Sequence, residues 1–186
     1  MISWILPAVL VLMLVWLILI YNGVVSIRND VESSWKQIDV QLKRRHDLIP
    51  NLVQTVKGAM AFEQDTLEKV ISARSKAVSA STPAAKSEAE NELTQTLGKL
   101  FAVMENYPDL KSNRNVMQLQ EELTSTENRI AFARQLYNDL IANFRTKIQV
   151  FPNNIVSAIF NFQSEEYFGA DEIARAVPAV DLSLRK

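Results

Sequence analysis

The chain has 186 residues, of which 48% are apolar and 22% are charged, and its formal net charge is −1. The absence of cysteine excludes a disulfide framework, thiolate metal sites and a cysteine nucleophile, and the single histidine excludes metal sites built on a histidine pair. The near-zero net charge argues against a general nucleic-acid binder, and the four widely spaced glycines exclude a glycine-rich phosphate-binding loop.

The first 21 residues differ from the rest, because all but Ser3 and Pro7 are apolar and no charged residue precedes Arg28. A helix over residues 2–21 would be about 30 Å long, which matches the hydrocarbon core of a bilayer. The segment has neither the basic start nor the small-residue cleavage site of a signal peptide. The sequence therefore predicts a retained membrane anchor over residues 1–21, with membrane lipid as its partner through residues 2–21.

Basic residues follow the anchor but do not precede it, Arg28 and Lys36 being the nearest. Short segments rich in Lys and Arg next to a membrane helix stay in the cytoplasm. We therefore expect a single pass with the N-terminus outside and the rest of the chain in the cytoplasm.

After the anchor, apolar positions recur at intervals of three and four residues, which indicates helices throughout. We expect the first soluble helix to continue from the anchor, to kink or restart at Pro50 with Asp47 as its N-cap, and to resume as far as Arg74. Its seam is of coiled-coil type and includes two arginines: Val24, Arg28, Val31, Trp35, Ile38, Leu42, Arg45, Ile49, Leu52 and Val56.

Turn residues divide the remainder. Thr82 can cap a second helix that begins at Pro83, and residues 106–109 form a turn before a third helix from about Ser112 to Phe151. Asn154 can cap a short fourth helix. The prediction is an all-α fold: one transmembrane helix, then an antiparallel up-and-down bundle of three long helices and a short fourth over residues 22–162, and an irregular tail over residues 163–186.

Three blocks of the sequence resemble the LemA family: VQLKRRHDLIPNLV at residues 40–53, ENYPDLK at 105–111 and TENRIAFAR at 126–134. Tyr137-Asn138-Asp139 and Phe151-Pro152 continue the match, so that it covers nearly the whole chain in the family's order. The resemblance implies a bacterial inner-membrane protein with an N-terminal anchor and an up-and-down helical bundle. It implies no catalytic activity, because none is established for the family.

The most basic run, residues 43–46, could bind anionic lipid. However, Lys43 follows Tyr21 by 22 residues, which is about 33 Å along a straight helix. A membrane surface potential decays over about 8 Å at physiological salt. We therefore favour ion pairing, and we expect Arg45 to meet an acidic partner on another helix, Glu105 or Glu127.

Other polar and aromatic residues have two interpretations. His46 and Asp47 are adjacent in a helix and point in different directions, so they are not expected to form a catalytic dyad. Asn128-Arg129 and Asn138-Asp139 could fix helix register or bind a partner, whereas Trp35 and Tyr137 are expected in the core. Four aromatic residues after the bundle either cover its end or form a contact patch: Phe160, Phe162, Tyr167 and Phe168.

No nucleophile, metal or phosphate motif occurs in the sequence, so no catalytic, metal or cofactor residue is expected. The favoured function is a non-enzymatic, membrane-anchored scaffold that forms a homo-oligomer. The alternative is a regulatory partner of an envelope-stress protease or a signalling complex. The candidate interaction or register-setting residues are Trp35, Arg44, Arg45, Asp47, Glu105, Asn106, Tyr107, Glu127, Asn128, Arg129, Tyr137 and Asn138.

Overall fold

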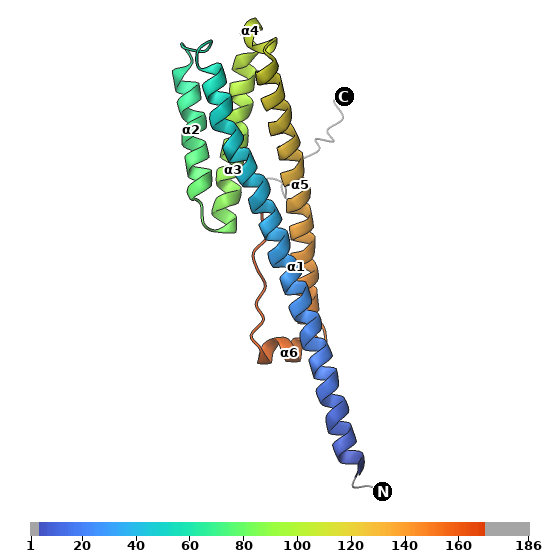
Figure 1. Cartoon of the computed structure of the whole chain (residues 1–186). Coiled ribbons are helices and arrows are strands. Elements are labelled where there is room, and N and C mark those ends of the chain that lie inside the picture. The colour runs from blue at the N-terminus through green and yellow to red at the C-terminus, as the bar shows by residue number, and fades with distance from the viewer. Residues whose placement is uncertain (1–3, 170–186) are drawn as a thin grey trace, which may run out of the picture.

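The computed structural model of the chain describes residues 4–169, and these contain helices but no strand. The described elements are α1 (Ile5–Val56), α2 (Gln64–Ser79), α3 (Pro83–Met104), α4 (Pro108–Lys111), α5 (Arg114–Gln149) and α6 (Asn153–Ile159). The prediction of an all-α fold with one long apolar N-terminal helix is confirmed. The apolar start of α1 projects alone from one end of the molecule (Figure 1).

The end of the molecule far from the apolar segment is a four-helix section, which we call the distal section. There the α2–α3 hairpin packs beside the C-terminal part of α1 and the N-terminal part of α5, and α4 lies at the tip (Figure 1). Helix α3 begins as predicted, since Thr82 Oγ1 accepts a hydrogen bond from the Ala85 N–H at 3.2 Å and Pro83 is the first helical residue. The core of this section consists mainly of Ile49, Leu52, Val56, Met60, Val70, Leu93, Leu97, Leu100, Met104 and Leu123.

The described part of the chain has one more long helix than predicted, because the first soluble helix does not continue to Arg74, which lies in the separate helix α2. Helix α1 ends at Val56, and the chain reverses over residues 57–63 before α2 begins. The backbone N–H groups of Ala59 and Met60 both bond to the Val56 carbonyl, and the Met60 side chain is buried. The apolar positions continue at helical spacing through this turn, so periodicity gave no sign of it.

Of the two outcomes expected at Pro50, the restart of the helix is wrong, because α1 runs through this proline without interruption. Asp47 is exposed on the helix and caps nothing. A proline inside a helix leaves the carbonyl four residues earlier without its donor. Here that carbonyl belongs to His46, and the Nε of Arg74 on α2 donates to it at 2.7 Å. The neighbouring helix thus supplies the hydrogen bond that the proline removes.

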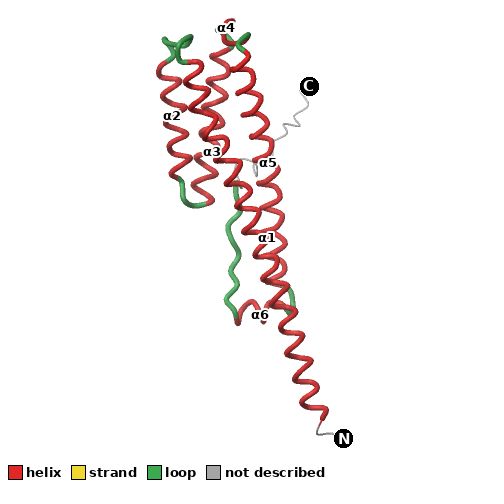
Figure 2. The backbone as a smooth tube through the Cα atoms, viewed as in Figure 1, coloured by secondary structure: helices red, strands yellow, loops and turns green. Residues whose placement is uncertain are grey.

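Within residues 4–169, the part of the bundle nearest the apolar segment, the proximal section, has α1 and α5 as its only long helices. Helix α6 crosses them at the base, and residues 160–169 then run back along the pair without helical structure (Figure 2). A second apolar cluster lies here, comprising Val24, Val31, Ile38, Leu42, Ile130, Tyr137, Ile141, Phe144 and Phe168. The predicted irregular tail is seen as far as Gly169, and its remainder lies outside the described residues.

Candidate functional site

Five polar side chains separate the two apolar clusters, and we call them the polar layer: Arg45, His46, Glu90, Thr94 and Glu127. On α1, Arg45 and His46 lie between Leu42 of one cluster and Ile49 of the other. On α5, Glu127 lies between the two clusters in the same way, and Glu90 and Thr94 come from α3. The seam spacing of α1 places Arg45 on the inner face of that helix.

Arg45 is the centre of the polar layer and binds three groups on two helices. Its Nη1 lies 3.0 Å from Glu90 Oε2, and its Nη2 lies 2.7 Å from Glu127 Oε2 and 2.8 Å from Thr94 Oγ1. The Arg45 side chain is 2% exposed and that of Glu90 is fully buried. The second oxygen of Glu90 lies 2.6 Å from His46 Nε2. Because a carboxylate can only accept, this imidazole nitrogen is the donor.

The polar layer is suited to fixing geometry, since its charged groups are paired and the Arg45–Glu90 pair is buried, whereas Glu127 is 40% exposed. Removing one partner of such a pair leaves a buried charge uncompensated, which costs about 3–5 kcal/mol. In this structure, Arg45 of α1 binds both Glu90 and Thr94, which are one helical turn apart on α3. These contacts favour the observed position of the α2–α3 hairpin along the long α1–α5 pair.

A second group of predicted residues forms an aromatic cluster in the proximal section. The Trp35 ring lies 5.2 Å from the Tyr137 ring and 5.3 Å from the Phe168 ring, between centroids. The Tyr137 hydroxyl donates to the Glu166 carbonyl at 3.1 Å. Burial raises the pKa of Tyr137 to about 12, and the nearby carboxylates of Glu165 and Glu166 add to this shift.

The Asn138 side chain binds the backbone of the returning segment, residues 160–169, at Phe168. Its Nδ2 donates to the Phe168 carbonyl at 3.0 Å, and its Oδ1 accepts from the Phe168 N–H at 3.0 Å. Phe168 is buried, and Phe162 and Tyr167 are half-buried against the proximal cluster. Of the two interpretations of the late aromatic residues, covering the bundle fits these three, whereas Phe160 remains 49% exposed.

The remaining predicted residues lie on the surface or at helix ends. Arg44 makes an exposed ion pair with Glu122 at 3.2 Å. Glu105 and Asn106 are exposed at the end of α3, far along that helix from Glu90, so Glu105 is not among the partners of Arg45. The Tyr107 hydroxyl donates to Glu63 Oε1 at 3.2 Å. Loss of solvation and the bonded Glu63 carboxylate raise the pKa of Tyr107.

Asn128 and Arg129 are both exposed on α5, which favours a surface role over hydrogen bonding between helices. Arg129 borders an open groove of about 540 Å³ between α1 and α5. Three apolar side chains line this groove and are largely exposed: Val40 (63%), Phe132 (74%) and Leu136 (46%).

Sequence reasoning missed Glu90, Thr94, Arg74 and the docking of Phe168. A signal for Glu90 exists, because it precedes Leu93 by three residues on the same face as Leu97 and Leu100. A carboxylate on an apolar helix face indicates a buried partner. Among residues 4–169, no group of three or more His, Cys, Asp or Glu side chains is placed to hold a metal ion.

Comparison with known proteins gives one family and several relatives. The model of the LemA family matches residues 34–182. Protein LemA of Metamycoplasma hominis is 27% identical over 158 residues, which cover 83% of this chain and 71% of the relative. The magnetosome protein MamQ 2 of Paramagnetospirillum magneticum is 25% identical over 178 residues, covering 82% of this chain but only 65% of the relative. For MamQ of Magnetospirillum gryphiswaldense, the identity is 24% over 185 residues, covering 86% and 68%. None of these names denotes an enzyme.

Proposed function

The chain belongs to the LemA family, and on that premise we propose that it is a non-enzymatic helical scaffold, anchored in the bacterial inner membrane, that associates with copies of itself. The observation that carries the proposal is the course of α1. This one helix includes the apolar segment and continues without a break into the bundle core, over 52 residues. No loop therefore separates the anchor from the bundle.

Membrane insertion is supported by the composition and exposure of the first part of α1. By length and composition, α1 is the one described helix apolar enough to cross a membrane. Leu6, Leu12 and Leu19 are each about two-thirds exposed or more (70%, 68% and 66%). Apolar surface of this extent is unfavourable in water and favourable in lipid.

Self-association is supported by the groove between α1 and α5. Its exposed Val40, Phe132 and Leu136 form a patch on the lateral face of the bundle. Anchoring holds every copy parallel and with this patch at the same height above the membrane. Anchoring thereby raises the effective concentration at which the patches of two neighbouring copies meet, and this lowers the entropic cost of pairing. A second copy of the chain is the occupant we propose.

Light scattering on the full chain in mild detergent, with crosslinking in native membranes, tests this proposal. We expect an oligomer for the full chain and a monomer at micromolar concentration for a shortened chain that begins at Ser26. Phe132→Asp should make the full chain monomeric without loss of helix. The matched control is Phe62→Asp, because Phe62 is 96% exposed in the distal turn and lies outside the groove.

A full chain that is monomeric both in detergent and in native membranes would overturn the scaffold proposal. It would favour the alternative, in which the same face binds a different protein and the chain is a regulatory partner of an envelope-stress protease or a signalling complex. Pull-down with the wild-type chain and with Phe132→Asp would then identify the partner that depends on this face.

We also propose that the bundle lies in the cytoplasm, because Arg28 and Lys36 follow the anchor and no basic residue precedes it. A reporter enzyme that is active only outside the cytoplasm, fused after Lys186, should be silent. Strong reporter activity would reverse the orientation without affecting the scaffold proposal.

A further inference from the structure

An exposed apolar surface lies at the base of the bundle, on α6 and the residues next to it. We call it the collar, and it consists of Val150 (46% exposed), Phe151 (77%), Ile155 (51%), Ile159 (65%) and Phe160 (49%). Ile155 and Ile159 are four residues apart and share one face of α6, and the exposed Phe151 lies in the turn just before this helix. Val156 and Ser157 are buried and attach the other face of α6 to the bundle.

The collar is also free of charge. No Asp, Glu, Lys or Arg occurs from Ile148 to Ser164, whereas charged residues make up 22% of the whole chain. The other long charge-free stretch is the start of the chain, up to Arg28. An exposed surface that is both apolar and uncharged is unusual in water and suits the boundary of a bilayer.

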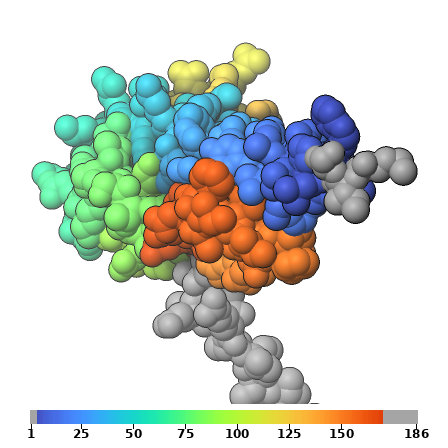
Figure 3. Space-filling model, turned by 90° about the horizontal axis from the view of Figure 1, so that it is seen from below, coloured from blue at the N-terminus to red at the C-terminus, as the bar shows by residue number. Residues whose placement is uncertain are grey.

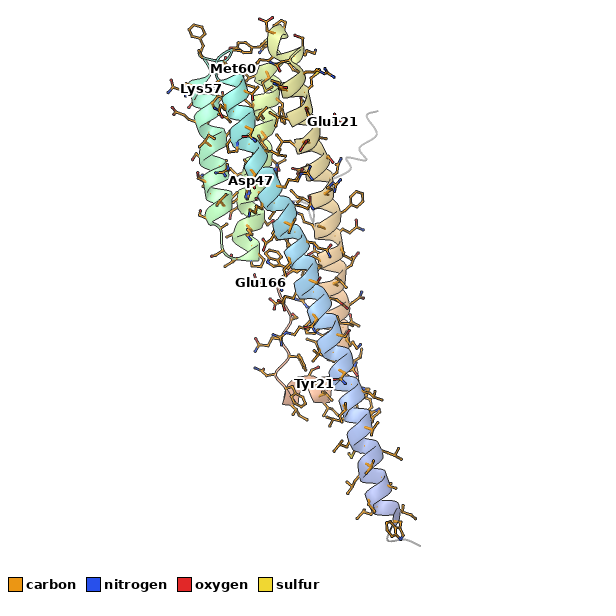
Figure 4. All side chains as sticks on the ribbon, in the orientation of Figure 1. Tyr21, Asp47, Lys57, Met60, Glu121 and Glu166 are labelled. Carbon is orange, nitrogen blue, oxygen red and sulfur yellow. The ribbon has the colours of Figure 1, made fainter. Side chains whose placement is uncertain are left out.

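The collar lies level with the end of the apolar part of α1. The Phe160 ring is 4.7 Å from the ring of Tyr21, and the Phe162 ring is 5.8 Å from it. Figure 4 labels Tyr21 where α1 passes α6. Seen from the anchor end, the orange segment around α6 forms much of the face beside the dark blue N-terminal helix (Figure 3). Tyr21 is the last residue of the apolar segment, where tyrosine marks the membrane interface.

Two basic residues, Arg145 and Lys147, lie in the last two turns of α5, just before the collar in the chain. Lys147 Nζ lies beside Gly23 of α1, 3.2 Å from the place that a Cβ on Gly23 would occupy. The Arg145 guanidinium lies 4.8 Å above the Tyr167 ring and donates to Ser164 Oγ at 3.2 Å and 3.3 Å. Lysine and arginine at this depth reach the phosphate groups of lipids. From the anchor towards the bundle, apolar side chains come first and basic side chains follow, as acyl chains are followed by headgroups in a bilayer.

We propose that the collar is a second membrane-binding site, which inserts into the interface of the bilayer that α1 crosses. This inference rests on the proposed anchoring. The occupant is the lipid surface, because Tyr21 sets the depth of the collar at the exit of the anchor and Lys147 lies at headgroup height. The chain then contacts the bilayer at two points, and the collar restricts the tilt of α1 and its bundle.

The chain has no cysteine, so single cysteines can carry a fluorescent label without a background. We propose the full-length variants Ile155→Cys, Leu12→Cys and Phe62→Cys, labelled with an environment-sensitive dye. Each is reconstituted in vesicles of phosphatidylcholine and phosphatidylglycerol, with enough lipid that a vesicle holds at most a single chain. The vesicles contain quencher lipids with a nitroxide either near the headgroup or near the end of the acyl chain.

We expect the Ile155 label to lose about half of its fluorescence to the shallow quencher and much less to the deep quencher, because interfacial helices lie about 5–10 Å into the headgroup region. The Leu12 label should respond most to the deep quencher, and the Phe62 label to neither. Quenching at Leu12 without quenching at Ile155 would overturn the collar proposal alone. Loss of quenching at Leu12 would overturn the proposed anchoring.

A charge on the collar provides a second test. Ile159→Asp in the Ile155→Cys chain should abolish most of the shallow quenching and leave the helical content unchanged. The matched control is Asn154→Asp, which adds the same charge to an exposed position of α6 outside the collar and should preserve the quenching. If Ile155 is shielded only when vesicles hold many chains, the collar binds a second copy and the lipid proposal is wrong.

Discussion

The distal and proximal sections bury the same helix, α1, in different ways. In the distal section, three other helices surround it and leucine-rich faces fill the core. Along most of the proximal section, the α2–α3 hairpin is absent, and α1 is covered by α5, by the short helix α6 and by a segment that has no helix (Figure 2). Large aromatic rings replace the missing helices there, since each ring covers as much surface as several aliphatic groups. The distal core therefore depends on many small contacts and the proximal core on a few large ones.

The polar layer marks the boundary between the two sections and supports the larger one. We expect Glu90→Leu to destabilise the chain by about 3–5 kcal/mol, because it leaves the buried Arg45 guanidinium with only the partly exposed Glu127 as an ionic partner. Arg45→Leu should cost less, since His46 still donates to Glu90. The double replacement by leucine should recover much of the stability. Denaturation of the full chain in detergent, followed by circular dichroism, measures these free energies of unfolding.

An equal loss for Glu90→Leu and for the double variant would contradict this account of the polar layer. It would show that the Glu90 carboxylate acts through His46 or through packing rather than through Arg45. Glu122→Leu is the matched control, because its ion pair with Arg44 is exposed and should contribute about 0–1 kcal/mol.

Phe168→Ala tests the dependence of the proximal section on single rings. Removing this buried side chain should cost about 3 kcal/mol or more. The damage should be greatest in the proximal section, because Phe168 packs on Trp35 of α1 and bonds to Asn138 of α5, whereas Leu93 and Leu97 belong to the distal cluster. Hydrogen exchange should rise in residues 161–169 and in the proximal parts of α1 and α5, and stay low around Leu93 and Leu97. Equal exchange in both sections would show that they unfold as one unit.

Alkaline pH should weaken the proximal section more than the distal one. The pKa of Tyr137 is raised to about 12 from 10.0, so above pH 10 the folded chain keeps a proton that the unfolded chain loses. The stabilisation is complete below pH 10 and declines by about 1–2 kcal/mol as the pH approaches the folded pKa. Tyr137→Phe should flatten this decline, whereas Tyr107→Phe, at the more exposed distal tyrosine, should change it little. Identical alkaline profiles for the wild type and Tyr137→Phe would contradict the assignment.

The sequence was sufficient for some levels of this structure and insufficient for others. Helical class and the apolar segment follow from periodicity and composition, which are local properties of α1 and α5. The turn at residues 57–63 does not, because Val56, Met60 and Leu67 keep a helical spacing across it. Periodicity cannot distinguish a helix that continues from one that reverses with its apolar face still inward.

The partners of Arg45 show a similar limit. A seam arginine predicts an acidic partner, and Glu127 is one of the two that the sequence suggested. Glu90 was missed because the position of α3 against α1 depends on where the chain reverses between α1 and α2, at residues 57–63, and periodicity did not locate that turn. The docking of Phe168 was not predictable either, since an extended segment carries no period, and its position depends on the Asn138 side chain.

The smallest expected effect concerns the helix that both sections share. In the wild type, Arg74→Met removes the donor to the His46 carbonyl and should cost about 1 kcal/mol, because that carbonyl is left without a partner. In a Pro50→Ala background, the new N–H of residue 50 can bond to the same carbonyl, so Arg74→Met should cost almost nothing there. The difference between the two losses is the coupling energy of a double-mutant cycle, measured by denaturation in detergent. A coupling of zero would mean that α1 tolerates Pro50 for a reason other than Arg74, and the hairpin would then support α1 only through packing.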